Sequence, residues 1–292
     1  MTDALPAPFR LLLVAIPLAA FATGLRTSEP LWLWKRRRLL VRSLLAILVV
    51  VPVVDLLLVE LLQPSRLIRA GIAVSILSVG IGPPSAFRRT RARDAHVAYE
   101  VGLDVALLVL AIVYVPAAVA LHGAIFDHPV RLDPAAVARV VLLQMLVPLA
   151  LGMTVARLAP QMVDRVSLHA GRVAFAALLV VAVVALLVAG RSLIELGLAA
   201  WLACALAAAS AILIGHVFGA ADRQYRAALV AFSVLRFPGL AFLIVAQVRL
   251  GHRLIPVVLA YLLASTLLLA LYAGASASRA RRQRPAHLEH AA

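Results

Sequence analysis

Residues 231–248, AFSVLRFPGLAFLIVAQV, are apolar over about the length of a membrane span, yet they contain Arg236 and, shortly after it, Pro238 and Gly239. A charge inside a bilayer is expensive, and proline removes a backbone donor and interrupts the helix. In lipid the freed backbone groups need partners, so such a break survives only where it is buried in protein or lines a cavity. The stretch therefore predicts a broken helix inside a larger helical bundle.

The rest of the chain is equally apolar. Of its 292 residues 64% are hydrophobic, and the mean hydropathy is +1.03. Runs long enough to cross a hydrocarbon core of about 30 Å recur along the whole length. We predict an all-α polytopic membrane protein, a single transmembrane domain over residues 1–292 with a basic cytoplasmic tail at 275–292. Nine spans are expected, at about 9–25, 39–62, 67–86, 96–121, 135–158, 172–190, 193–218, 227–249 and 254–274.

The formal net charge is +15. In a soluble protein this excess would suggest nucleic acid, but here the cations gather in alternate loops between the apolar runs, as the positive-inside rule describes. We therefore expect the lipid bilayer and no nucleic acid as a partner. The pattern predicts an integral protein of the plasma (cytoplasmic, or cell inner) membrane, with its N-terminus outside and its C-terminus in the cytoplasm.

A second span, 67–86, is also interrupted, at residues 80–89, GIGPPSAFRR, where Pro83 and Pro84 stand together. With breaks in spans three and eight, the first four spans correspond to the last four, and span five is left over. Because the offset is odd, the two halves run in opposite directions through the membrane. This is the inverted-repeat pattern of secondary transporters, whose substrate site lies where the broken helices meet. Chance spacing of prolines is the alternative reading.

Four segments, in their order, spacing and topology, resemble helices of the bile acid:sodium symporter (BASS) superfamily. They are SLLAILVVVPVVDLLL at 43–58, GIAVSILSVGIGPPSAF at 71–87, VVLLQMLVPLALGMTVARLAP at 140–160 and YRAALVAFSVLRFPGLAFLIVAQV at 225–248. The resemblance implies a divergent nine-helix member with two inverted repeats and crossing broken helices. It also implies a secondary active transporter of a small organic anion, in which a core bundle rocks against a panel bundle to give alternating access.

The chain departs from this family at the positions that supply oxygen ligands to sodium. These positions are occupied here by Ile47, Ala86, Phe87, Phe232 and Phe237, which offer no oxygen side chain. The resemblance implies sodium coupling, but these residues argue against it, so proton coupling and facilitated transport are both left open. A degenerate, non-transporting membrane sensor or scaffold of the same fold is the alternative function. Without a nucleophile, phosphate-binding or metal motif, we expect no enzyme, no cofactor and no metal site.

Four ionisable residues are candidates for binding the substrate or an ion. Arg236 lies in the second break, where it could replace a bound cation, hold an anionic substrate through two hydrogen bonds, or simply neutralise a carboxylate. We expect Glu100 and Asp104 as its partners, because they lie one turn apart on one helical face. Two adjacent carboxylates in low dielectric favour a shared proton, which would make a proton-coupling site. Glu100 pairing with arginines of the preceding loop is the alternative. Asp55, in mid-span, must face a partner or a cavity.

Overall fold

The computed structural model describes residues 7–26, 30–81, 95–125, 132–159, 161, 163–248 and 251–282. Almost all of these residues are helical, which confirms the all-α prediction. The α-helices are α1 (Ala7–Gly24), α2 (Arg37–Leu45), α3 (Val51–Leu62), α4 (Arg66–Leu77), α5 (Ala95–Ile125), α6 (Pro134–Val141), α7 (Val147–Leu158), α8 (Val163–Glu195), α9 (Gly197–Phe218), α10 (Arg223–Val234), α11 (Pro238–Gln247) and α12 (Ile255–Arg282).

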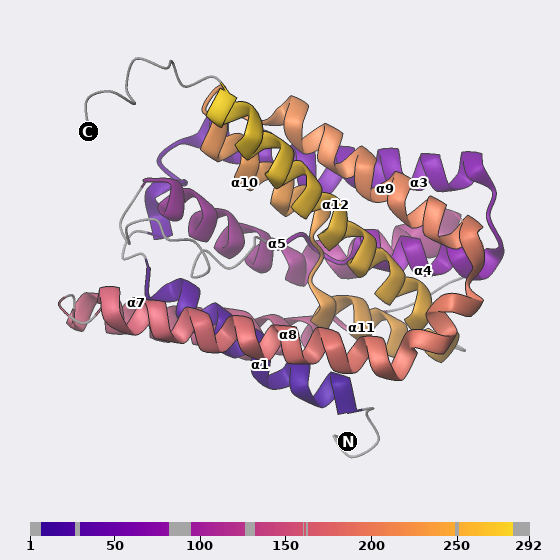
Figure 1. The fold of residues 1–292 in the computed structure, drawn as a ribbon, viewed down its shortest axis with the longest axis horizontal. Helices are drawn as coiled ribbons and strands as arrows, with labels where there is room; N and C mark the ends of the chain where they lie inside the picture. The colour runs from indigo at the N-terminus through magenta and orange to yellow at the C-terminus, as the bar shows by residue number, and fades with distance from the viewer. Residues whose placement is uncertain are drawn as a thin grey trace.

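The helices form two bundles (Figure 1). In the smaller one, which we call the panel bundle, α1 packs along both α7 and α8. In the larger one, the core bundle, α9 packs against α3, α10 and α12, and α4 and α5 lie between these helices and the panel. The helix α6 continues into α7 and is counted with the panel, whereas α2 and α11 belong to the core. The described helices are thus divided between two packed groups.

Six helical stretches of the described residues are long and apolar enough to cross a membrane: Arg37–Leu62, Ala95–Ile125, Pro134–Leu158, His169–Glu195, Gly197–Phe218 and Ile255–Ser276. The other three predicted spans contain shorter helices. They are α1 and the two interrupted spans, which are divided by their breaks. The last helix, α12, continues to Arg282, beyond the predicted end of its span, because alanine and arginine are strong helix formers.

Two spans are bent rather than broken by proline. A π-helical turn, Ala46–Val50, joins α2 to α3, and a second, Leu142–Leu146, joins α6 to α7. Each turn is followed directly by a valine and a proline, Pro52 or Pro148. Because proline lacks an N–H and its ring would clash with the carbonyl one turn earlier, a widened turn accommodates it without ending the helix.

The first halves of the two broken helices share one design. Both α4 and α10 have 12 residues, and each begins at a side-chain N-cap. The Ser65 hydroxyl accepts the N–H of Ile68 at 3.5 Å, and the Asp222 carboxylate accepts the N–H groups of Gln224 and Tyr225 at 2.7 and 3.3 Å. Burial alone would raise the pKa of Asp222, but these hydrogen bonds hold it below the ordinary value of an aspartate.

The two breaks pair with each other. After α4 and α10 the chain becomes extended, and the two extended segments run antiparallel. The Ile81 N–H donates to the Leu235 carbonyl at 3.2 Å, and the Phe237 N–H donates to the Val79 carbonyl at 3.0 Å. Thus each break satisfies backbone groups that the other frees, as a membrane interior requires. In addition α4 packs against α12 and α10 against α5, which is the exchange between halves that inverted repeats produce.

The breaks begin earlier than the prolines indicate. The helix α4 ends at Leu77, before the predicted break at Pro83 and Pro84, which lie outside the described residues. In the second break, Pro238 is the first residue of α11 and Gly239 follows it. Proline suits that position because its missing N–H would have no partner in the helix. The prolines of the sequence therefore locate the breaks approximately, and the backbone pairing determines where the helices end.

Gly80 permits this close approach, and its replacement should destabilise the protein. A Cβ atom at Gly80 would lie 2.1 Å from the Phe232 carbonyl oxygen and 3.1 Å from the Ile47 side chain. The backbone oxygen cannot move without disturbing the pairing, so we expect Gly80→Ala to cost about 3 kcal/mol of unfolding free energy. Thermal unfolding in detergent measures this against Gly190→Ala, where a Cβ meets nothing within 4 Å. Equal unfolding temperatures for the two variants would contradict the close packing of the breaks.

Candidate functional site

Arg236 lies in the paired breaks and is buried, with 2% of its surface exposed. It pairs with Gly80 across the antiparallel bridge. The helix α10 ends at Val234, just before Arg236, and α4 ends at Leu77, just before Gly80. A helix C-terminus carries a partial negative charge. The fold thus provides a position that favours a cation, and a permanently charged side chain occupies it.

Asp55 of α3 is an acidic side chain that interacts electrostatically with this arginine, and it is fully buried. Its Oδ1 accepts a hydrogen bond from Ser210 of α9. The carboxylate lies within electrostatic range of the Arg236 guanidinium, as do the hydroxyls of Tyr114 on α5 and Tyr261 on α12. We call Asp55, Ser210, Arg236 and Tyr261 the internal charge cluster. The cluster thus contains one carboxyl group and one guanidinium inside the core bundle.

Apart from the hydrogen bond from Ser210 to Asp55, the members of this cluster interact over a distance. Nε and Nη2 of Arg236, Oδ2 of Asp55 and the Tyr261 hydroxyl are all buried, and none of these atoms has a hydrogen-bond partner within the described residues. The Tyr261 hydroxyl is near the guanidinium but outside hydrogen-bonding geometry. Because a buried charge without an opposite charge is costly, Asp55 and Arg236 depend on each other.

The structure brings Asp55 within electrostatic range of Arg236. Glu100 and Asp104 do share a face of α5, and both are buried, with 3% and 7% exposed. The pairing of these two carboxylates with Arg236 stays a prediction. Their one-turn spacing predicts a common face correctly but does not indicate which neighbour that face meets.

Asp104 instead lines a cavity of about 110 Å³ between the two bundles, which we call the interface cavity. The breaks contribute Ile81 and Pro238 to its wall, and the panel contributes Thr23 together with apolar side chains. Arg236 does not line it. The apolar lining residues are Ile16, Ala19, Ala20, Met145, Leu149 and Leu178. Because panel, core and break all contribute to this cavity, movement of one bundle against the other changes its access.

Two further polar side chains, Thr23 and Gln144, lie at or near this cavity. The Thr23 hydroxyl donates to the Ala19 carbonyl at 2.9 Å within α1, so its oxygen can still accept a second hydrogen bond. Gln144, in the π-helical turn before α7, lies against Gly239: a Cβ on that glycine would come within 2.5 Å of the Gln144 Oε1. The signal for Gln144 is its position four residues before a proline in a span, where π-helical turns form.

Three of the positions that the family resemblance relates to sodium ligands are occupied by buried apolar side chains in the structure. Ile47, Phe232 and Phe237 are fully buried and belong to one hydrophobic cluster, which also contains Val79 of the first break. Ala86 and Phe87 lie outside the described residues. Among the residues that the structure describes, no group of three or more His, Cys, Asp or Glu side chains could hold a metal ion.

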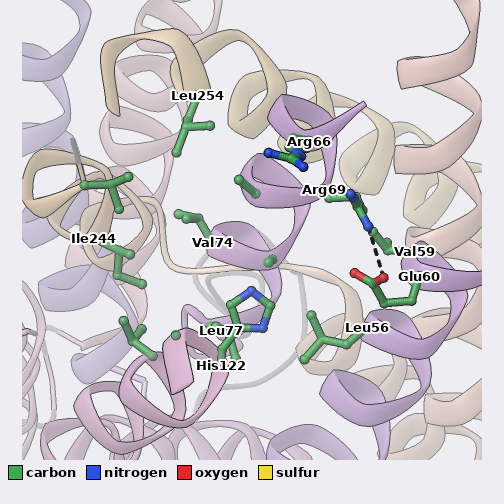
Figure 2. Close-up of a pocket in the computed structure, with 15 residues that line it drawn as sticks. Leu56, Val59, Glu60, Arg66, Arg69, Val74, Leu77, His122, Ile244 and Leu254 are labelled. Carbon is green, nitrogen blue, oxygen red and sulfur yellow. Dashed lines mark hydrogen bonds and ion pairs between the residues drawn. The ribbon is translucent and has the colours of Figure 1, made fainter. Parts of the chain in front are cut away.

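A larger cavity, of about 350 Å³, lies inside the core bundle (Figure 2). Among the described residues, its wall comes from α3, α4, α5, α11 and the turn before α12, and none of these residues belongs to the panel. A cavity enclosed by one bundle keeps its surroundings when the two bundles move.

Paired breaks, opposed halves and a cavity between two bundles define a polytopic membrane protein with the architecture of a secondary transporter. The family described as "Sodium Bile acid symporter family" has a model that matches residues 11–196. The chain belongs to this family; it is a membrane transporter of the bile acid symporter type and not an enzyme. A search of curated proteins found no match. The family match ends before α10, so the equivalence of the second break rests on its pairing with the first.

Proposed function

We propose that the protein is a secondary active transporter that carries a small organic anion together with a proton, without sodium, by alternating access at the interface cavity. The observation that carries this proposal is the position of Asp104, which lines the cavity beside the breaks while Arg236 stays inside the core bundle. The charges of the loops support a plasma-membrane orientation with the N-terminus outside and the C-terminus in the cytoplasm.

Arg236 supports the absence of sodium coupling. A guanidinium is charged at every accessible pH and is covalently attached, so it stabilises the paired breaks at every stage of a transport cycle. It therefore fills the electrostatic role of a bound cation but cannot be released on one side of the membrane. The apolar cluster around Ile47, Phe232 and Phe237 offers no oxygen ligands for a mobile cation. The driving ion must then bind elsewhere.

Asp104 provides a site for a proton. When ionised it repels an anionic substrate, and when protonated it donates its O–H to a substrate carboxylate. The helix α11 begins at Pro238, on the wall of the same cavity, and the positive end of its dipole favours an anion there. Each anion would thus enter with one proton, and the loaded cavity would carry the same net charge as the empty one.

The main alternative, a non-transporting sensor or scaffold, requires that the internal charge cluster fill the crossing and leave no substrate site. The separation of the two features supports transport instead. Asp55 and Arg236 interact within the core bundle, whereas the interface cavity beside the breaks is lined by Asp104 and Thr23.

The test is uptake into proteoliposomes that contain the purified protein, with labelled pyruvate, succinate and gluconate as probes. We expect at least one probe to accumulate when a pH gradient, acidic outside, is imposed without sodium on either side. Adding a sodium gradient at equal pH should drive no uptake, and protein-free liposomes give the background. Accumulation that requires sodium would overturn the proposed coupling, and the absence of protein-dependent uptake for all three acids would favour the non-transporting alternative.

A further inference from the structure

The core cavity has the dimensions of a binding site for a small ligand. Its volume of about 350 Å³ is near the lower end of the roughly 300–1,000 Å³ of pockets that hold drug-sized molecules. Most of its wall is apolar, and the lining side chains of α3, α4 and α11 include Leu56, Val74 and Ile244 (Figure 2).

Positive charge gathers at one part of this wall. Arg66 and Arg69 lie one turn apart on α4, and both line the cavity. Nη1 of Arg69 pairs with the Glu60 Oε2 at 3.1 Å, as the dashed line in Figure 2 shows. Arg66 makes no ion pair within the described residues. Two guanidinium groups thus face one carboxylate, which leaves a net positive charge and unused N–H donors beside an apolar wall.

The cavity follows α4 along its whole length. Its lining residues on this helix extend from Arg66, the first helical residue, through Ala70 and Ala73 to Leu77, the last one before the break. Twelve helical residues cover roughly 17 Å along the axis. The short side chains of Ala70 and Ala73 leave open space in the cavity between the two ends. The surface therefore combines a cationic end with a long, narrow apolar stretch.

We infer that the core cavity binds a single-chain amphipathic carboxylate, with its head group on Arg66 and Arg69 and its chain along Ala70 and Ala73. A small inorganic anion would leave the apolar wall unused, and the volume is too small for both chains of a phospholipid. The core bundle alone surrounds this site, so the ligand stays with that bundle and is not the cargo of the interface cavity. Because Leu77 adjoins the break, an occupied site also packs against the end of α4 at the crossing.

Titration calorimetry with octanoate on the full-length protein, in a nonionic detergent, tests this inference. We expect saturable binding, with octanol, which lacks the charge, and acetate, which lacks the chain, at least about tenfold weaker. The double variant Arg66→Gln/Arg69→Gln should also lose about tenfold in affinity, since it loses the charge-assisted hydrogen bonds. Arg191→Gln is the matched control, because Arg191 forms an exposed pair with Glu195 on the panel.

A second variant keeps the charges and fills the apolar part. Ala73→Leu should weaken octanoate binding while the unfolding temperature shows that the protein remains folded. Unchanged octanoate affinity in both the double variant and Ala73→Leu would overturn the inference. So would complete loss of octanoate binding in nanodiscs of phosphatidylglycerol but not phosphatidylcholine, since the arginines would then bind lipid head groups. Asp104→Asn should leave octanoate affinity unchanged, which separates this site from the proposed transport site.

Discussion

Asp104→Asn is expected to abolish accumulation driven by a pH gradient and to preserve exchange of substrate across the membrane. Asparagine has nearly the same shape, and its NH₂ group donates a hydrogen bond permanently, as the protonated carboxyl does. The variant can therefore bind the anion but cannot take up or release a proton. Accumulation in proteoliposomes should fall to the level of protein-free liposomes, while counterflow of labelled against unlabelled substrate continues.

The dependence on pH has a definite sign. In the unchanged protein, uptake should fall as the external pH rises, because ionised Asp104 repels the substrate anion. In Asp104→Asn, counterflow should be independent of pH. Glu195→Gln removes an exposed panel carboxylate and serves as the control that keeps the pH dependence. If Asp104→Asn still accumulated substrate in response to a pH gradient, or if Glu100→Gln alone removed the response, Asp104 would not be the proton site.

The second break could be predicted from local chemistry. An arginine, a proline and a glycine inside an apolar run violate the rules for a simple membrane helix, and the violation indicates where the helix ends. The structure places the extended backbone at residues 235–237, directly at this point. The all-helical architecture follows from hydropathy in the same way, because each apolar run carries its own signal.

The end of α4 could not be predicted in this way. Its last residue is Leu77, several residues before the prolines, because Val79 and Ile81 pair with the distant backbone of Leu235 and Phe237. The proximity of Asp55 to Arg236 could also not be predicted from the sequence. Asp55 is on α3, and the sequence indicates only that it needs a partner; which helices meet around the arginine depends on packing between segments that are far apart in the chain.

Arg236→Met is expected to be among the most destabilising single substitutions in the protein. It leaves Asp55, which is fully buried, without an opposite charge, and breaking a buried pair in this way costs about 3–5 kcal/mol. Unfolding in detergent should show this loss, whereas Arg139→Met, which removes an exposed arginine of α6, should change little. The double variant Asp55→Asn/Arg236→Met should recover most of the stability, since it buries no charge and keeps an oxygen to accept the Ser210 hydrogen bond.

The double variant also separates the two roles that Arg236 could have. If the main role of the arginine is to neutralise Asp55, as the internal charge cluster indicates, recovery of stability should be accompanied by recovery of pH-driven uptake. If it holds the substrate anion directly, the double variant should be stable and still fail to bind substrate, because no cation would remain at the crossing. An Arg236→Met protein as stable as the unchanged one would contradict the mutual dependence of the two charges. The distinction rests on the observation that Arg236 lies close to Asp55 and outside the wall of the interface cavity.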